Sequence, residues 1–173
     1  LRRSLFLIDQ ILLDVFEVSS ELTVQMDWLA HAGVPKLAPA GEATPSGDKV
    51  TLGHKDGYQH FSDLQAWNAT GDSQWEFVQN AKKKLRLWIN GIDGQQILTG
   101  KRLGYHKTQK CPVLIRRLNS NRARFVTVYD LSGNASNIEH VNVSADGERI
   151  RTRDGEWMVR FGKVGIQANF EAR

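Results

Sequence analysis

The segment Leu13–His31 reads LDVFEVSSELTVQMDWLAH, and its pattern decides the expected fold class of the chain. Its second half alternates apolar and polar residues, which is the period of a β-strand with one buried face. The apolar members of this alternation share one face: Leu22, Val24, Met26 and Trp28. Asp27 and His31 lie on the opposite face, because side chains of a strand point alternately to its two sides. The segment therefore predicts a strand with a core tryptophan and a polar pair that faces away from the core.

Further strand-like runs follow along the whole chain. They cover residues 85–89, 113–115, 122–129, 138–143 and 157–161. Asp146-Gly147 and Asp154-Gly155 separate the last runs, and Asp-Gly favours a hairpin because a type I′ turn needs positive φ at both central positions. Residues 9–16 fit either a short helix or two strands separated near Asp9-Gln10. The chain is therefore predicted to be all-β, with roughly ten or more strands in an antiparallel β-sandwich.

The domain organisation follows from the length and from the turn residues. A chain of 173 residues is long enough for one domain with a hydrophobic core, so we expect a single β-sandwich domain over residues 1–173. Prolines and glycines interrupt every period between residues 33 and 57, which predicts a long loop with one short strand at Val50–Leu52. The two Asp-Gly turns predict a C-terminal β-meander over residues 136–173.

The composition excludes several classes of protein. Hydrophobic residues make up 40% and charged residues 24%, as in an ordinary globular domain. No run approaches the roughly 20 apolar residues that a membrane helix needs. Leu1-Arg2-Arg3 lacks an initiating Met and leads into a short apolar run without a signal-peptide cleavage site, so we expect an internal piece of a longer protein. The single Cys111 excludes an internal disulfide.

The charge is mildly basic. The net charge of +4 and the isoelectric point of about 9.3 favour encounter with polyanions. Basic clusters occur at residues 82–86, 116–117 and 149–153. The arginines of the last cluster alternate along one strand and could bind a polyanion, but we expect them to form a solvated outer face of the sheet. These clusters lack the interleaved aromatic residues that are typical of nucleic-acid-binding modules, so we expect no nucleic-acid partner.

The sequence carries no recognisable motif for metal binding, nucleotide binding or nucleophilic catalysis. It has no phosphate-binding glycine loop and no serine nucleophile elbow. None of the five histidines stands at a metal-ligand spacing from another: His31, His54, His60, His106 and His140. We therefore expect no metal, no cofactor and no catalytic residue in this chain.

The order LDVF, a short polar gap and DWLAH resembles a stretch in the C-terminal β-sandwich of heparinase II/III-like polysaccharide lyases, which include oligoalginate lyases. The resemblance continues through the Pro/Gly-rich loop, Gly57-Tyr58-Gln59, a Trp-bearing region and the strand-like run 85–89. It ends with residues 111–129 and covers residues 1–135 of the chain. The resemblance implies the distal part of a lyase sandwich domain.

Members of this family cleave uronate-containing polysaccharides by β-elimination, with a Tyr, a His and often an Asn of an upstream α/α-toroid as the proton-transfer groups. The resemblance implies an acidic polysaccharide or oligosaccharide as partner, an upstream helical toroid in the same parent chain, and a periplasmic or secreted location. It places any divalent metal in the missing upstream part. It also implies that this chain supports the cleft rather than supplying catalytic residues.

The candidate substrate-binding residues in this chain are Asp27, His31, Tyr58 and His60. Tyr58 and His60 share a face if residues 57–61 form a strand, and aromatic rings stack on sugars while histidine pairs with carboxylates. The alternatives are a surface Asp–His pair without a ligand and a tyrosine that packs beneath the loop.

Two other functions stay open from the sequence. One is a non-catalytic carbohydrate-binding β-sandwich module, and the other is a structural or protein-interaction sandwich without a ligand. An exposed aromatic strip on one sheet would favour carbohydrate binding. Uniformly buried tryptophans would favour the structural role.

Overall fold

The protein is built almost entirely of β-strands. A computed structural model describes residues 1–69, 71–104, 109–133, 136–144, 146–162 and 165–173. The elements in these residues are β1 (Arg2–Ile8), β2 (Ile11–His31), β3 (Lys36–Pro39), β4 (Thr44–Pro45), the 3₁₀ helix η1 (Tyr58–His60), β5 (Ser62–Asn68), β6 (Ser73–Asn80), β7 (Lys83–Ile89), β8 (Gln96–Leu103), β9 (Lys110–Asp130), β10 (Ile138–Ser144), β11 (Gly147–Thr152), β12 (Gly155–Phe161) and β13 (Ile166–Ala172). The all-β, antiparallel sandwich-like fold predicted from the sequence is confirmed.

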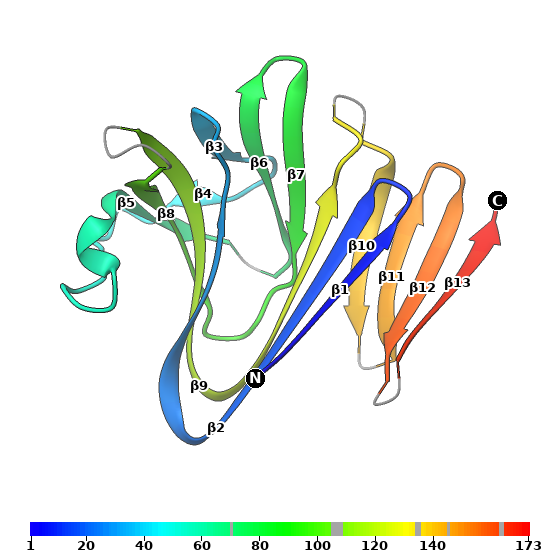
Figure 1. The fold of residues 1–173 in the computed structure, drawn as a ribbon, viewed down its shortest axis with the longest axis horizontal. Coiled ribbons are helices and arrows are strands. Elements are labelled where there is room, and N and C mark those ends of the chain that lie inside the picture. Colours follow the sequence, from blue (N-terminus) through cyan, green and yellow to red (C-terminus); the bar gives the residue numbers. More distant parts are fainter. Residues whose placement is uncertain (70, 105–108, 134–135, 145, 163–164) are drawn as a thin grey trace.

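A long, bent strand pair organises the larger sheet. β2 and β9 pair antiparallel from Ile11↔Asp130 to His31↔Val113, and the register shifts between Ser19 and Val24. Figure 1 shows the two strands turning together at this bend. Along its other edge, β9 pairs first with β8 and then with β7. The bend therefore divides the nine-stranded sheet into one half with β1, β7, β6 and β3 and another half with β8, β5 and β4.

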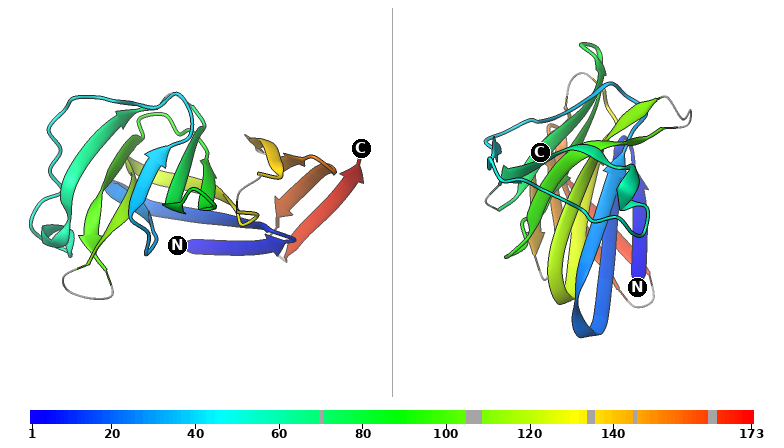
Figure 2. Two further views of the ribbon diagram at one scale, coloured as in Figure 1. Left: turned by 90° about the horizontal axis from the view of Figure 1, so that it is seen from above. Right: turned by 90° about the vertical axis from the view of Figure 1, so that its left-hand side faces the viewer.

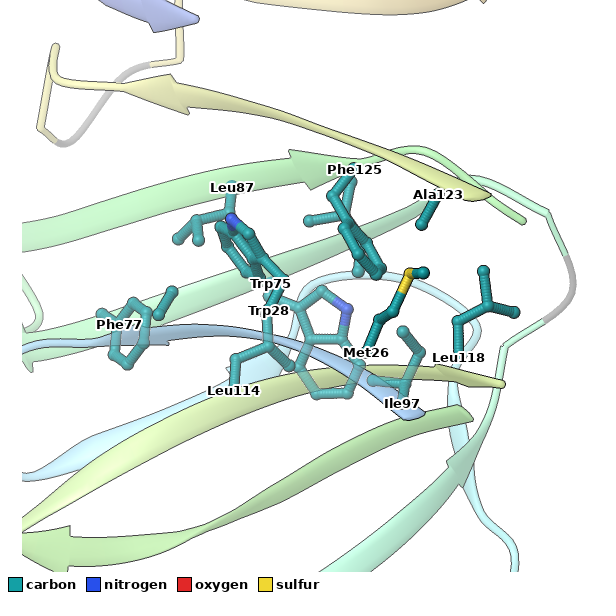
Figure 3. Packing of buried hydrophobic residues seen from close by; sticks show 12 residues of the cluster. Met26, Trp28, Trp75, Phe77, Leu87, Ile97, Leu114, Leu118, Ala123 and Phe125 are labelled. Atoms are coloured by element: carbon teal, nitrogen blue, oxygen red, sulfur yellow. The ribbon is translucent and has the colours of Figure 1, made fainter. Parts of the chain in front are cut away.

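The main hydrophobic core lies between these two halves, because both halves contribute to the same cluster of buried side chains (Figure 3). The half with β8 contributes Met26, Trp28, Ile97, Leu114 and Leu118, and the half with β7 contributes Trp75, Phe77, Leu87, Ile89, Ala123 and Phe125. Trp28 is only 4% exposed, as its place in the alternation predicts. The apolar face of the segment that decides the fold class thus becomes one wall of the core near Trp28, whereas Leu22 and Val24 at the bend are exposed.

A buried cation lies inside this core. Arg116 of β9 is completely buried and stacks over the rings of Trp28 and Phe125, at 5.6 and 5.0 Å from the ring centroids. Its guanidinium donates hydrogen bonds to the side-chain oxygen of Gln95, to the carbonyl of Val126, and to both the carbonyl and the side-chain oxygen of Asn90. These oxygens replace the water that burial removes.

A second, four-stranded sheet covers the outer face of the half with β7. Its strands follow one another in the order β10-β11-β12-β13, which is a meander. The sheet packs through Val141, Ile150 and Val159 against Leu13 and Val128 of the larger sheet. Figure 2 shows it beside the curled larger sheet. The described part of the chain therefore stacks three β layers: two halves of one sheet, then the small sheet.

Several local expectations differ from the structure. Val50 and Leu52 are not in a strand but pack beneath the sheet half with β8, while β3 and β4 are the two short strands of the 33–57 region. Asp154 does not have positive φ, so the Asp154-Gly155 hairpin turn is not type I′, and the turn at Asp146-Gly147 adjoins residue 145, which lies outside the described residues. Residues 9–16 adopt the two-strand alternative, because Asp9 takes a positive φ of 47° and reverses the chain between β1 and β2.

Candidate functional site

The candidate site lies on the outer face of the half-sheet formed by β2, β9 and β8. Val113 and Ile115 of β9 and Leu98 of β8 form the apolar floor of this face. The loop after β4 covers the floor with Val50 and Leu52 and then brings in Tyr58 of η1 and Phe61. Asp27 and His31 of β2 point to this same face, because Met26, Trp28 and Ala30 point into the main core.

Asp27, Arg117 and Tyr58 form a closed hydrogen-bonded group. Arg117 lies directly opposite Asp27 in the β2–β9 pairing, and it donates from Nε to Oδ1 at 2.9 Å and from Nη2 to Oδ2 at 2.7 Å. The Tyr58 hydroxyl donates to Oδ2 of the same carboxylate. The Arg117 guanidinium also lies over the Tyr58 ring, 5.5 Å from its centroid. Asp27 thereby joins the loop to the sheet.

The hydrogen bonds of this group shift the pKa values of Arg117 and Tyr58. The Asp27 carboxylate raises the pKa of Arg117, and it does so first by accepting its hydrogen bonds. The pKa of the Tyr58 phenol is also raised, because burial and the hydrogen bond to Asp27 both disfavour the phenolate. Tyr58 is therefore a neutral hydroxyl with a charged pair behind it. Both Asp27 oxygens are occupied inside the protein, so direct contact of Asp27 with a substrate stays a prediction.

His31 lies further along β2 beside Arg102 of β8. Arg102 Nη1 is 2.9 Å from Nε2 and 3.2 Å from Nδ1 of the imidazole. Burial, and then the charge of Arg102, lowers the pKa of His31. Because a guanidinium only donates hydrogen bonds, it favours the neutral imidazole. An incoming carboxylate would accept from Arg102 and would also favour a protonated His31.

Tyr58 and His60 do not share a strand face, so that expectation is wrong. Asp56 and Gly57 both have positive φ, 57° and 88°, and they turn the chain into a 3₁₀ helix over Tyr58–His60. Tyr58 turns toward the sheet, whereas His60 is exposed and its Nε2 lies 3.4 Å from Gln59 Nε2. Among the described residues, no hydrogen bond joins His60 to the Asp27 group. The structure thus brings together Tyr58 and Asp27, with His31 on the same face and His60 apart.

Two arginines of this face were missed as site residues. Arg117 belongs to a basic cluster for which the sequence predicts no specific role, and no local pattern singles out Arg102. The Arg117 contact depends on the β2–β9 register over a separation of 90 residues. Cross-strand pairing of opposite charges is the signal that could have found it, but only once the register is known.

The tryptophans separate two of the functions left open by the sequence. Trp28, Trp75 and Trp88 are buried, and Trp67 and Trp157 are half-buried, so no tryptophan is exposed. A glycan-binding strip needs aromatic faces open to solvent. The inward tryptophans therefore weigh against a carbohydrate-binding module built on them and favour a supporting role.

Comparisons and absences add little to the geometry. No family model matches the chain, and no curated protein is significantly similar to it. Within the described ranges no group of three His, Cys, Asp or Glu residues could hold a metal ion, and His106 lies outside those ranges. No helix of the described residues is long and apolar enough to cross a membrane.

Proposed function

We propose that this chain is the β-sandwich part of a polysaccharide lyase that cleaves uronate-containing glycans by β-elimination. The observation that carries the proposal is the outer face of the half-sheet with β8, where Arg102, Arg117, His31 and Tyr58 lie around an apolar floor. Such a face offers cations and hydrogen-bond donors to uronate carboxylates and a phenol ring to the sugar. It would form one wall of the substrate cleft.

The chemistry itself belongs elsewhere in the parent protein. β-Elimination removes the proton at C5 of the uronate and needs a base and an acid on either side of the scissile bond. We assign these groups to an upstream helical toroid of the same parent chain, together with any divalent metal. The parent would be periplasmic or secreted, where acidic polysaccharides or their oligosaccharides are encountered.

The resemblance and the fold support this assignment together. The segment quoted for the resemblance, LDVF to DWLAH, is the β2 half of the long bent pair and carries both the Trp28 core contact and the Asp27–Arg117 pair. A binding module built on exposed aromatic residues is the weaker alternative, since the tryptophans point inward. A supporting wall requires only a rigid face with a few polar groups.

The substrate role of this face is tested with Arg102→Gln in the full-length parent, assayed on alginate, heparin and hyaluronan by the ultraviolet absorbance of the unsaturated product. We expect KM to rise about fivefold with kcat nearly unchanged, because Arg102 would hold a carboxylate away from the reacting atoms. Lys101→Gln is the matched control, since it removes one charge from the same strand at a residue already paired with Asp63. An unchanged KM in the Arg102 variant, or equal effects of both variants, would argue against a carboxylate subsite.

A further inference from the structure

The strand β1 leaves one edge of the larger sheet open. Among the described residues, β1 pairs with β2 and with no other strand, and in the right-hand view of Figure 2 it forms one margin of the sheet. The edge strands β3 and β4 of the same sheet are short and carry Pro39 and Pro45, which hinder pairing with a further strand. β1 is seven residues long and contains no proline, so it keeps the backbone groups that a further strand needs.

The hairpin between β1 and β2 decides which of these backbone groups face the open edge. Its loop has two residues, and Ile8 lies opposite Ile11. In a two-residue hairpin the pair that flanks the loop exchanges both backbone hydrogen bonds, and hydrogen-bonded and non-hydrogen-bonded pairs alternate from there. Arg3, Leu5 and Leu7 therefore direct their N–H and C=O groups away from β2, toward the open edge.

The side chains of the same residues form an open apolar surface. Leu5 is 55% exposed and Leu7 is 62% exposed, and neither belongs to the main core. Phe6 and Ile8 differ, because they lie on the opposite face of β1 and pack against the small sheet. A strand that pairs with β1 would therefore find backbone groups and two leucine side chains together, and it would remove the leucines from water.

Opposite charges stand at the two ends of β1. Arg3 donates from Nε and Nη2 to the buried carboxylate of Asp14, and among the described residues its Nη1 has no hydrogen-bond partner. Asp9 follows directly after β1, is exposed, and forms no ion pair within the described part of the chain. When two identical strands run antiparallel, the start of one meets the end of the other. Arg3 of one copy would then lie beside Asp9 of a second copy.

We propose that two copies of this chain associate by antiparallel pairing of their β1 strands about a two-fold axis at Phe6. In this register Leu5 lies opposite Leu7 of the second copy, and Arg3 lies opposite Asp9 of the second copy. Apolar side chains meet apolar ones and opposite charges meet, which are the pairs that stabilise neighbouring strands. The contact uses the same surface on both copies, so it closes at two. It does not depend on the proposed uronate-binding face, because it requires only this chain.

The test is sedimentation velocity of the 173-residue chain at concentrations from about 1 to 300 µM. We expect a monomer–dimer equilibrium with a dissociation constant of about 10–100 µM, because one strand pair buries a small interface. Leu7→Lys should raise this constant about tenfold or more, because it removes two buried leucines from the dimer. Leu22→Lys is the matched control, since Leu22 is 73% exposed at the bend and lies outside β1. It should leave the constant unchanged.

The register is tested by disulfide formation between two cysteine variants, Leu5→Cys and Leu7→Cys. The Cα atoms of a hydrogen-bonded antiparallel pair lie about 5.5 Å apart, which suits a disulfide. A mixture of the two variants should therefore form the mixed disulfide faster than either variant crosslinks with itself. The unmodified chain gives the background rate, since its single Cys111 is buried.

Four results would overturn the proposal. They are a chain that stays monomeric at every concentration, equal effects of Leu7→Lys and Leu22→Lys, and faster crosslinking within one cysteine variant than between the two. The fourth is a full-length parent that stays monomeric under conditions in which the 173-residue chain dimerises, because another segment of the parent would then occupy the edge of β1.

Discussion

At the scale of single residues, the most unusual feature is a cation inside the main core. Arg116 has no carboxylate partner among the described residues, and oxygens of Asn90, Gln95 and Val126 accept its hydrogen bonds. Burial lowers its pKa to about 9, so the side chain stays charged at neutral pH. Asn90 Oδ1 also accepts from the backbone N–H of Val126, which makes Arg116 the centre of a network across β9 and the loop after β7.

Arg116→Met is therefore expected to lower the free energy of unfolding by about 3 kcal/mol, because it fills the space but leaves several buried oxygens without a donor. Urea denaturation measures the loss. Arg122→Met, at an exposed residue of the same strand, should change stability by less than about 0.5 kcal/mol. A loss below about 1 kcal/mol for Arg116→Met would mean that the network contributes little.

At the scale of elements, the turn before β6 and the loop after β7 meet through two glycines. A Cβ added at Gly91 would lie 2.5 Å from the backbone of Gly71, and the Gly91 N–H donates to Asp72. Gly91→Ala should thus force the two segments apart and destabilise the protein by about 1–3 kcal/mol. Thermal or urea unfolding checks the size of the effect.

Gly41→Ala is the control for this change, since nothing lies within 4 Å of a Cβ there and Gly41 does not have positive φ. It should leave stability nearly unchanged. Equal stabilities of the two variants would contradict the close approach of Gly71 and Gly91.

Sequence patterns predicted the elements better than their contacts. Alternation placed Trp28 in the core and Asp27 and His31 on the other face, because strand geometry alone decides which side a residue faces. It could not show that Gly57 starts a 3₁₀ helix, since that depends on positive φ at Asp56 and Gly57. It also could not pair Asp27 with Arg117, which requires the register of two distant strands.

At the scale of the whole molecule, an ion pair joins the two sheets. Arg124 of β9 donates to Glu148 of β11, a fully buried carboxylate, and lies 3.7 Å from Glu17. Burial raises the pKa of Glu148, and the hydrogen bond and charge of Arg124 oppose that rise. The small sheet therefore carries a buried carboxylate whose charge Arg124 of the larger sheet helps to compensate.

Arg124→Gln should destabilise the protein by about 2 kcal/mol near neutral pH, a value discounted because Arg124 is one-third exposed. The variant raises the folded-state pKa of Glu148 further. Because the pKa of Glu148 in the folded protein lies above its ordinary value, protonated Glu148 stabilises the fold. This contribution is complete below the pKa of the unfolded chain and is lost as the pH rises through the pKa of the folded protein. The difference from wild type should accordingly shrink toward about pH 4–5 in urea denaturation.

Arg149→Gln provides the comparison on the same small sheet, because Arg149 is exposed and pairs with Glu156 at the surface. Its effect should be within about 0.5 kcal/mol and should not vary with pH over this range. A pH-independent loss in Arg124→Gln would instead indicate that Glu148 stays ionised without its partner.

The arrangement of the strands in three layers could not be predicted from the sequence. The runs of apolar residues predicted an antiparallel sandwich, and the strands follow these runs, but nothing local shows that one sheet bends at Ser19–Val24 to form two of the three layers. The bend depends on a register shift between the pairs Ser19↔Arg122 and Val24↔Ser120, whose members lie far apart in the chain. The outward face of β2 becomes a candidate site only because this bend and the 33–57 region leave Arg102, Arg117 and Tyr58 around it.

We propose that this folded sheet braces a uronate-cleaving centre carried by the rest of the parent protein. The most direct measurement compares the full-length parent with the isolated 173-residue chain on alginate, heparin and hyaluronan, following the ultraviolet absorbance of the unsaturated uronate product. We expect a rise with the parent on at least one polymer and none with the chain alone. No rise with the parent on any uronate polymer, or turnover by the isolated chain, would contradict it.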